Sequence, residues 1–331
     1  MRQLYLHIGY PKTGTTAIQE FMRLNREILL KQKILYPETG IKKNSHHQIP
    51  WVFTDDCRAN VNLSRSEITS GLKKEYHDNP SVEKVVISSE GFIFAVKPED
   101  ALEMFRDDFD DIKLIIYMRQ PFRWIQSDYN QGVKGWRQLT CSFDEHLNSI
   151  LSSKDSPMNF YNMLSKWASV FGWGNLIVRS YDVERLDLTS SFLKILGVKE
   201  PSEFIIPECE DSNPRLSVSQ LERLRAINAL ELSDDERKWL LGQISDVETA
   251  GVKGVVSVKE NFFYHLDKSM LKRINKNNKK LLKYFDKNIF EKDFFTLINP
   301  DKDKVLMNQI DINRLTEMVQ PLAAKLLDSR R

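Results

Sequence analysis

Short apolar runs alternate with segments of helical spacing in the N-terminal part of the chain, and this pattern restricts the fold more than any other feature of the sequence. Four runs have the length and composition of buried strands. Strands that alternate with helices predict an α/β fold, in which a parallel β-sheet is covered by helices on both faces. The expected strands are 4–9, 83–89, 112–118 and 175–180, and the expected helices are 15–31, 65–79, 98–109, one that starts at residue 121, and 186–196.

The rest of the chain reads differently, because from about residue 215 the pattern is almost entirely helical. We find no sharp linker, repeat or low-complexity segment in it. We therefore predict one α/β domain over residues 1–300, helical from about residue 215, and a C-terminal helical extension over residues 301–331. The candidate helices of this part are 217–230, 233–249, 267–288 and 311–328.

Bulk properties exclude some classes of protein. The formal net charge of +2 argues against a nucleic-acid-binding protein. Cys57, Cys141 and Cys209 are widely spaced and odd in number, which argues against a disulfide framework and fits a reducing compartment. The apolar stretch near the N-terminus is too short for a signal peptide or a membrane span. We expect a cytoplasmic protein and leave peripheral contact with a membrane surface open.

The loop from Gly9 to Thr16 (GYPKTGTT) joins the first expected strand to the first expected helix. Its two glycines, five residues apart, permit a tight turn whose backbone N–H groups converge on an anion. The start of the helix adds further N–H donors and the positive end of the helix dipole. An ordinary turn in which Thr15 caps the helix is the alternative. We favour a phosphate-binding loop.

This loop departs from the pattern of nucleotide triphosphatases. Thr15 occupies the position of their lysine, and the lysine present is Lys12, inside the loop. The strands 83–89 and 112–118 are followed by Glu and Arg rather than ending in the aspartate that would hold magnesium. A donor other than magnesium-bound ATP is therefore expected.

The segment Tyr10–Thr16 resembles the 5′-phosphosulfate loop of sulfotransferases that use 3′-phosphoadenosine 5′-phosphosulfate (PAPS), which have a P-loop-type fold. The resemblance implies that Lys12 contacts the oxygen between phosphate and sulfate, and that no metal is required. It also implies a 5′-phosphate site built from Pro11, Lys12, Thr13, Gly14, Thr15 and Thr16. Further segments extend the resemblance to bacterial members of the family over most of the chain, at 126–134, 167–179, 213–217 and 278–285.

A second phosphate site is expected after the third strand, which is followed by Arg119. A guanidinium and a hydroxyl on the next helix, here Ser127, suit a phosphate. This pair resembles the 3′-phosphate motif of the same family, and Tyr181 matches a tyrosine that lies near the adenine in some members. A packing role for Tyr181 stays open. The loop that completes this site in many eukaryotic relatives is missing, and Arg215 or Gly251–Gly254 are candidate substitutes.

Sulfuryl transfer needs a base for the acceptor proton and a cation for the leaving oxygen. Lys12 is our candidate for the cation. Glu90 directly follows the second expected strand and is one candidate base. His46 and His47 are the other, because histidine titrates near neutrality. For Glu90 the alternatives are a solvated carboxylate at a strand end and a partner for Arg119, and for the histidines the alternative is a polar loop. A zinc site is disfavoured because no ligand set with metal spacing surrounds the histidines.

The acceptor is visible only indirectly. Trp51, Phe53 and Trp136 lie among polar residues, which suits a sugar, although an apolar pocket lining is equally compatible. Segment 268–287 is rich in lysine, and a solvated helix face is favoured over a guide for an anionic polysaccharide or a membrane surface.

We therefore predict transfer of a sulfuryl group from PAPS to a hydroxyl, less readily an amine, of a cell-surface carbohydrate or polysaccharide, with release of the product PAP. Two alternatives remain at this stage. One is a P-loop phosphotransferase of the kinase type, and the other is a non-catalytic nucleotide-binding protein. The oligomeric state stays open.

Overall fold

The computed structural model describes residues 2–54, 62–198, 204–207, 216, 218–230, 232–233, 235–237, 268–291 and 293–295. The chain divides into two compact units. The first comprises Met1–Pro121, Pro157–Glu210 and Arg273–Thr296, and the second comprises Phe122–Ser156, Asp211–Lys272 and Leu297–Arg331. The expected extension over 301–331, most of the expected helix 233–249, Arg215 and Gly251–Gly254 lie outside the described residues.

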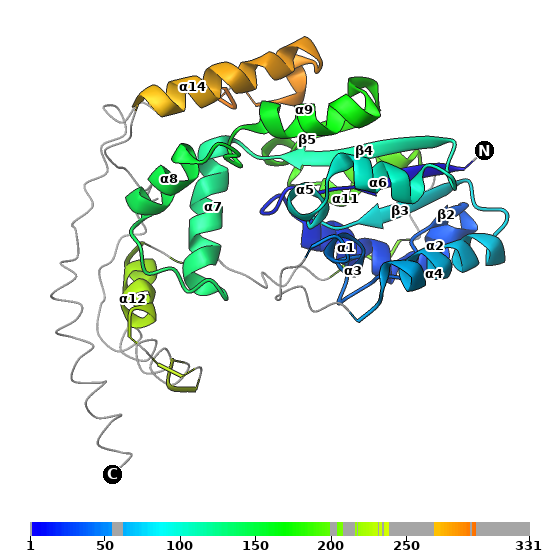
Figure 1. Cartoon of the computed structure of the whole chain (residues 1–331), viewed down its shortest axis with the longest axis horizontal. Helices are drawn as coiled ribbons and strands as arrows, with labels where there is room; N and C mark the ends of the chain where they lie inside the picture. The colour runs from blue at the N-terminus through cyan, green and yellow to red at the C-terminus, as the bar shows by residue number, and fades with distance from the viewer. Residues whose placement is uncertain are drawn as a thin grey trace. The chain divides into compact units, whose positions relative to one another are not determined.

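The first unit contains a five-stranded sheet with the strand order β2-β3-β1-β4-β5 (Figure 1). All of its pairings are parallel, which confirms the expected α/β fold. The four expected strands are present. The fifth, β2, was missed because two residues are too short to show an alternating pattern. The strands are β1 (Gln3–His7), β2 (Ile34–Leu35), β3 (Lys84–Ser88), β4 (Asp111–Met118) and β5 (Leu176–Ser180).

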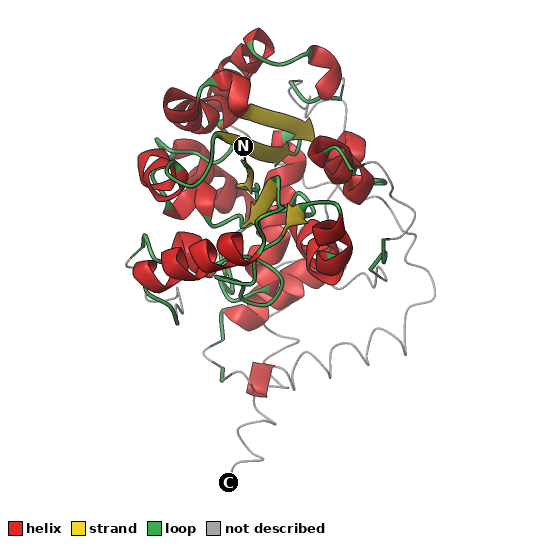
Figure 2. Ribbon diagram, turned by 90° about the vertical axis from the view of Figure 1, so that its right-hand side faces the viewer, coloured by secondary structure: helices red, strands yellow, loops and turns green. Residues whose placement is uncertain are grey.

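Helices cover the strands of this unit on both faces (Figure 2). One expected helix, 15–31, is interrupted at Asn25, whose side-chain amide bonds to the backbone of Phe21 and of Ile205. Another ends as expected at Gly197, which has a left-handed backbone with φ 68°. The helices of this unit are α1 (Thr15–Leu24), α2 (Arg26–Lys31), α3 (Gln48–Trp51), α4 (Arg65–Asp78), α5 (Phe92–Ala95), α6 (Pro98–Phe105), α9 (Phe160–Phe171), α10 (Tyr181–Glu184) and α11 (Leu188–Leu196).

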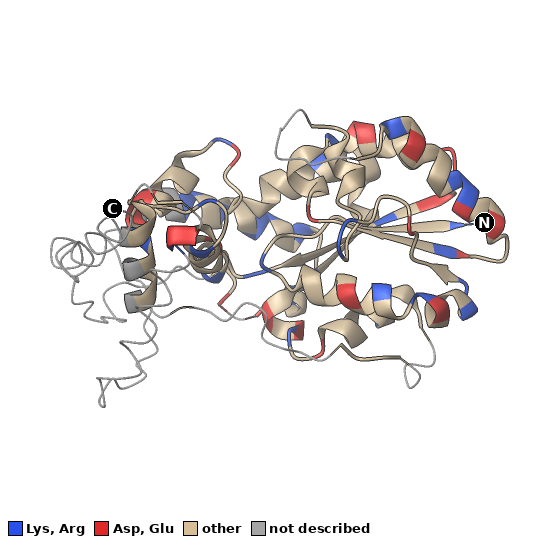
Figure 3. Cartoon of the chain, turned by 90° about the horizontal axis from the view of Figure 1, so that it is seen from below, with Lys and Arg blue, Asp and Glu red and all other residues tan. Residues whose placement is uncertain are grey.

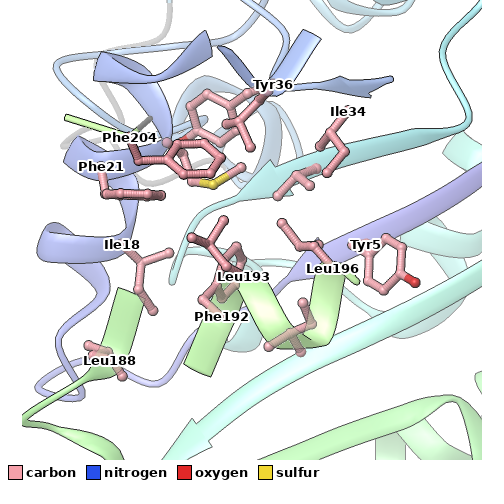
Figure 4. Packing of buried hydrophobic residues seen from close by; sticks show 14 of the residues in the cluster. Tyr5, Ile18, Phe21, Ile34, Tyr36, Leu188, Phe192, Leu193, Leu196 and Phe204 are labelled. Atoms are coloured by element: carbon pink, nitrogen blue, oxygen red, sulfur yellow. The ribbon is translucent and has the colours of Figure 1, made fainter. Parts of the chain in front are cut away.

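Successive side chains of a strand point to opposite faces of the sheet, and this alternation explains how the core forms. Tyr5 of β1 and Ile115 of β4 belong to one buried cluster with Phe21 of α1 and Phe192 of α11. Figure 4 shows Tyr5, Phe21 and Phe192 in this cluster. The intervening residues of both strands are also buried, so the sheet is covered on its other face too. Charged residues of both signs lie mainly on the surrounding helices, and the strands carry few (Figure 3). This packing fixes the strands whose ends carry the site.

The second unit is helical where it is described. It contains most of α7 (Pro121–Lys134), and α8 (Phe143–Ser152) and α12 (Val218–Asn228), the last of which confirms the expected helix 217–230. The side chain of Asn228 donates hydrogen bonds to the carbonyl oxygens of Val133 and Leu139, at 2.9 and 3.2 Å. The lysine-rich segment starts with α14 (Lys268–Asn278), of which the residues from Arg273 onward belong to the first unit. Within the described ranges, no helix combines the length and the apolar character needed to cross a membrane.

Candidate active site

Three neighbouring strands end at the same edge of the sheet, because β3, β1 and β4 run parallel and adjacent. His7, at the end of β1, pairs with Ser88 of β3 and with Ile115 of β4. The phosphate loop follows β1 and therefore emerges between the ends of β3 and β4. Ligands of open parallel sheets gather at this carboxyl edge.

The loop has an unusual backbone. Gly9, Lys12 and Gly14 all have positive φ, at 58°, 69° and 75°. For the non-glycine Lys12, a left-handed conformation costs about 1–2 kcal/mol, and such strain concentrates at functional sites. Left-handed positions placed between ordinary ones are typical of backbone nests, whose N–H groups converge on an anion. This backbone fits the expected phosphate loop.

Side chains inside the loop hold this conformation. The hydroxyl of Thr13 is buried and donates to the carbonyl oxygen of Tyr10. The buried phenol of Tyr10 donates in turn to the carbonyl oxygen of Pro157. Thr15 starts α1 and is buried, whereas Thr16 is exposed. Thr13 and Tyr10 therefore stabilise the loop from within.

The loop meets the end of β3 at Gly9. A Cβ atom on Gly9 would lie 3.1 Å from the Cα of Glu90 and 3.2 Å from Cγ2 of Thr15, so any larger residue would push the loop and the strand end apart. The structure thus places Glu90 beside the first residue of the loop.

Glu90 belongs to a small polar network. Its Oε2 accepts a hydrogen bond of 2.9 Å from Nε2 of Gln19, in α1. Its Oε1 lies 3.9 Å from Nε2 of His47. Nδ1 of His47 is 2.7 Å from the hydroxyl of Ser89, which also accepts a bond from the N–H of Gly91. Glu90 and His47 are both partly accessible, with 27% and 23% of their side chains exposed.

The two adjacent histidines have different environments. His46 is fully buried, its Nε2 donates to the carbonyl oxygen of Pro37, and its Nδ1 accepts from the N–H of Ser88. Burial lowers the pKa of His46 to about 3. His47 is only partly buried and also has a lowered pKa, mainly from burial and against the opposing effect of Glu90. Both ring nitrogens of His46 are engaged in the fold, which argues against His46 as the base.

At the end of β4, Arg119 contacts three groups. Its Nη1 donates to the carbonyl oxygen of Lys12 at 3.4 Å, and its Nε lies 3.6 Å from Oδ1 of Asp182. The guanidinium also lies over the ring of Tyr181, 5.3 Å from the centroid. The structure therefore brings Arg119 against the loop lysine's backbone and beside Tyr181.

Tyr181 lies against the loop as well. A Cβ on Gly14 would come within 2.9 Å of its ring and 2.4 Å of Leu188, so only glycine fits at Gly14 with this packing. The carboxylate of Asp182 is 6% exposed and accepts a bond from the N–H of Gln120 at 3.0 Å. Tyr181 and Asp182 follow β5, which places a fourth strand end at the site.

Further residues that the sequence singled out are only in part placed at this site. Ser127 and Trp136 belong to the second unit, so the pairing of Ser127 with Arg119 stays a prediction. Trp51 stacks on His47, with ring centroids 5.0 Å apart, whereas Phe53 packs against the guanidinium of Arg65. In the lysine-rich segment Ile274 and Leu281 are buried and the lysines whose exposure is described lie at the surface, as a solvated helix face requires.

Sequence reasoning missed two residues of this site, Gln19 and Asp182. Gln19 is a polar residue on the apolar face of α1, and a polar residue within that apolar pattern was the sequence signal that could have identified it. Asp182 directly follows Tyr181 at a strand end, which was a weaker one. Their partners lie far away in the sequence.

The sequence matches the family model described as the sulfotransferase domain over residues 5–235, a segment that contains the loop, Glu90, Arg119 and Tyr181. The chain belongs to the sulfotransferase family, which confirms the resemblance inferred from the sequence. An uncharacterized protein from Archaeoglobus fulgidus is 28% identical over 181 residues. That match covers 52% of this chain but only 45% of the relative's length.

Solved structures with a similar fold include three further proteins. A sulfotransferase from Alicyclobacillus acidocaldarius is 18% identical, with a TM-score of 0.42, over 75% of this chain and 94% of that one. The sulfotransferase domain from the curacin biosynthetic pathway is 14% identical, with a TM-score of 0.40, over 84% and 97%. Retinol dehydratase in complex with androsterone and inactive cofactor PAP is 16% identical, with a TM-score of 0.32, over 86% and 82%. These values are too low to define a substrate.

Proposed function

We propose that this protein transfers a sulfuryl group from PAPS to the hydroxyl of a carbohydrate and releases PAP. One observation carries the proposal. The loop packs at Gly9 against the Cα and Cβ of Glu90, at the end of β3, and the carbonyl oxygen of Lys12 accepts a hydrogen bond from Arg119, at the end of β4. A proton acceptor and an anion-binding cation thus lie on opposite sides of one anion site.

In this proposal the loop holds the 5′-phosphosulfate of PAPS. The nest around Lys12 and the start of α1 supply N–H donors to the phosphate. Arg119 binds the 3′-phosphate and the ring of Tyr181 packs near the adenine, whereas a share of Ser127 in that phosphate site rests on the sequence motif alone. The Nε of Arg119 is buried against the carboxylate of Asp182, and 20% of the side chain stays exposed, so a ligand would reach the guanidinium from its exposed side.

The acceptor side favours Glu90 as the base. The hydroxyl of Ser89 accepts from Gly91, so its own hydrogen is available to Nδ1 of His47. When Nδ1 of His47 accepts this hydrogen bond, the neutral imidazole carries its own hydrogen on Nε2, the nitrogen that faces Glu90. At 3.9 Å this contact is too long for a hydrogen bond, so His47 lies beside the carboxylate and Glu90 accepts the proton.

The reaction follows from these roles. The acceptor hydroxyl gives its proton to Glu90 while its oxygen attacks sulfur. The bond between sulfur and the bridging oxygen breaks, and Lys12 stabilises the negative charge that develops on that oxygen. A carbohydrate acceptor is supported by the ring of Trp51, which is partly exposed and stacks directly on the imidazole of His47, beside Glu90.

Two measurements test the proposal. PAP without magnesium should raise the melting temperature, because a ligand that binds only the folded state stabilises it. Labelled sulfate should then move from PAPS to at least one member of a panel of glycans. Stabilisation by magnesium-bound ATP but not by PAP would indicate a kinase-type phosphotransferase. PAP binding without transfer to any glycan or small alcohol would indicate a non-catalytic nucleotide-binding protein.

A further inference from the structure

Gln19 is a polar side chain on the buried face of α1. It shares that face with Thr15, Ile18 and Met22, and only 3% of the residue is exposed. A buried amide is tolerated where its polar atoms find hydrogen-bond partners. The partners of Gln19 therefore indicate why a glutamine is present at this position.

Those partners lead to the candidate base. Nε2 of Gln19 lies 2.9 Å from Oε2 of Glu90 and 3.3 Å from the hydroxyl of Ser88. An ionised carboxylate can only accept, so the amide nitrogen rather than the amide oxygen must face Glu90. The other oxygen of Glu90, Oε1, lies towards His47. One carboxylate oxygen is thus held by α1, and the second is left for the imidazole and an acceptor.

We propose that Gln19 is a positioning residue, which holds the carboxylate of Glu90 beside the phosphate loop through the bond from its Nε2 to Oε2. The proposal rests on the proposed function, in which Glu90 is the base. Helix α1 begins at Thr15 as the direct continuation of the loop, and Gln19 lies about one turn further along. One helix therefore supplies both the N-terminus that binds the donor and the amide that orients the base. Helix α1 thereby fixes the position of the proton acceptor relative to the donor.

The first test replaces Gln19 with a residue of similar shape but without a donor. Q19M should lower kcat about ten- to hundredfold, as expected for the loss of a hydrogen bond to a charged group. The affinity for PAP should change by no more than about twofold, because the loop itself is unaltered. Q48M is the matched control. Gln48 is also buried, at 8% exposure, but it bonds to the backbone of Ile41 and Asn62, so its kcat should stay close to the wild-type value.

A second variant separates positioning from structural support. In Q19E the new carboxyl group repels Glu90 when both are ionised, but when it is protonated it donates to Glu90 as the amide does. The rate of Q19E relative to Q19M should therefore rise as the pH falls below neutrality. Unchanged turnover of Q19M, or identical pH profiles of Q19M and Q19E, would overturn the proposal.

Crystal structures can test the role of Gln19 even if the proposed function is wrong. If the wild-type protein transfers no sulfuryl group from PAPS, the proposed function has failed. The role of Gln19 would then be decided by crystal structures of wild type and Q19M. A displaced Glu90 carboxylate in Q19M supports the proposal, and an unmoved one contradicts it.

Discussion

The charged side chains at the two strand ends beside the loop have different surroundings. At the end of β3, the carboxylate of Glu90 is held by the neutral amide of Gln19 and faces an imidazole whose pKa is lowered by burial. At the end of β4, the guanidinium of Arg119 is paired with the nearly buried carboxylate of Asp182. A carboxylate among neutral donors remains available to accept a proton. A cation fixed by a counter-ion and a ring has a defined direction from which to bind an anion. In the proposed function, one side of the loop would serve proton transfer and the other side donor binding.

The largest effect is expected at the β3 end. Glu90→Gln keeps the shape and the contact with α1 but removes the base, so kcat should fall by about 10²–10⁴. The affinity for PAP, measured by calorimetry, should stay within about twofold. His47→Ala should lower kcat less, because His47 lies beside the base without a hydrogen bond to it. If His47→Ala abolished turnover and Glu90→Gln did not, the histidine would be the base instead.

Lys12, between the two ends, tests whether the loop itself acts on the leaving oxygen. Lys12→Ala should lower sulfuryl transfer by about 10²–10³, because a positioned charge on the leaving group is lost. PAP, which lacks the sulfuryl group, should still bind. Lys31→Ala, at an exposed position in α2, is the control. Wild-type turnover of Lys12→Ala would refute its role.

A substitution at the end of β4 should change the affinity for the donor more than it changes kcat. Arg119→Ala should weaken the affinity for PAP about ten- to hundredfold, as expected when a charged hydrogen bond is lost. At saturating donor, kcat should fall much less than in Glu90→Gln. Arg106→Ala, on an exposed residue after α6, should bind PAP as the wild type does. Equal affinity of Arg119→Ala and wild type would remove the second phosphate site and with it the contrast between the two ends.

The last prediction leaves activity and binding unchanged in kind and concerns stability, where it tests the burial of His46. The pKa of His46 in the folded protein, about 3, lies below the ordinary value of 6.5, so the unfolded chain takes up a proton that the folded chain does not. Stability is therefore complete above pH 6.5 and is lost as the pH falls towards 3. His46→Gln should reduce this slope by up to about 1.4 kcal/mol per pH unit in denaturant unfolding. The exposed His77→Gln is the control, and equal slopes for both variants would contradict the buried role of His46.

The sequence by itself determined the elements and the place of the site. Apolar runs and helical spacing gave four of the five strands and most of the helices of the first unit, and the order of strands and helices gave a parallel sheet. The loop Gly9–Thr16 was recognisable from its glycines and from its place between a strand and a helix. Glu90, Arg119 and Tyr181 could be placed because each directly follows a strand.

Only the tertiary structure decided which side chains act on one another. Gln19 meets Glu90 across 71 residues of sequence, and Asp182 reaches Arg119 from the end of another strand. His46 and His47 look equivalent in the sequence, yet one is buried with both nitrogens bonded and the other is partly exposed beside the candidate base. The reason is physical. Periodicity and turns depend on consecutive residues, whereas burial and hydrogen-bond partners depend on residues that the folded chain brings together from distant positions.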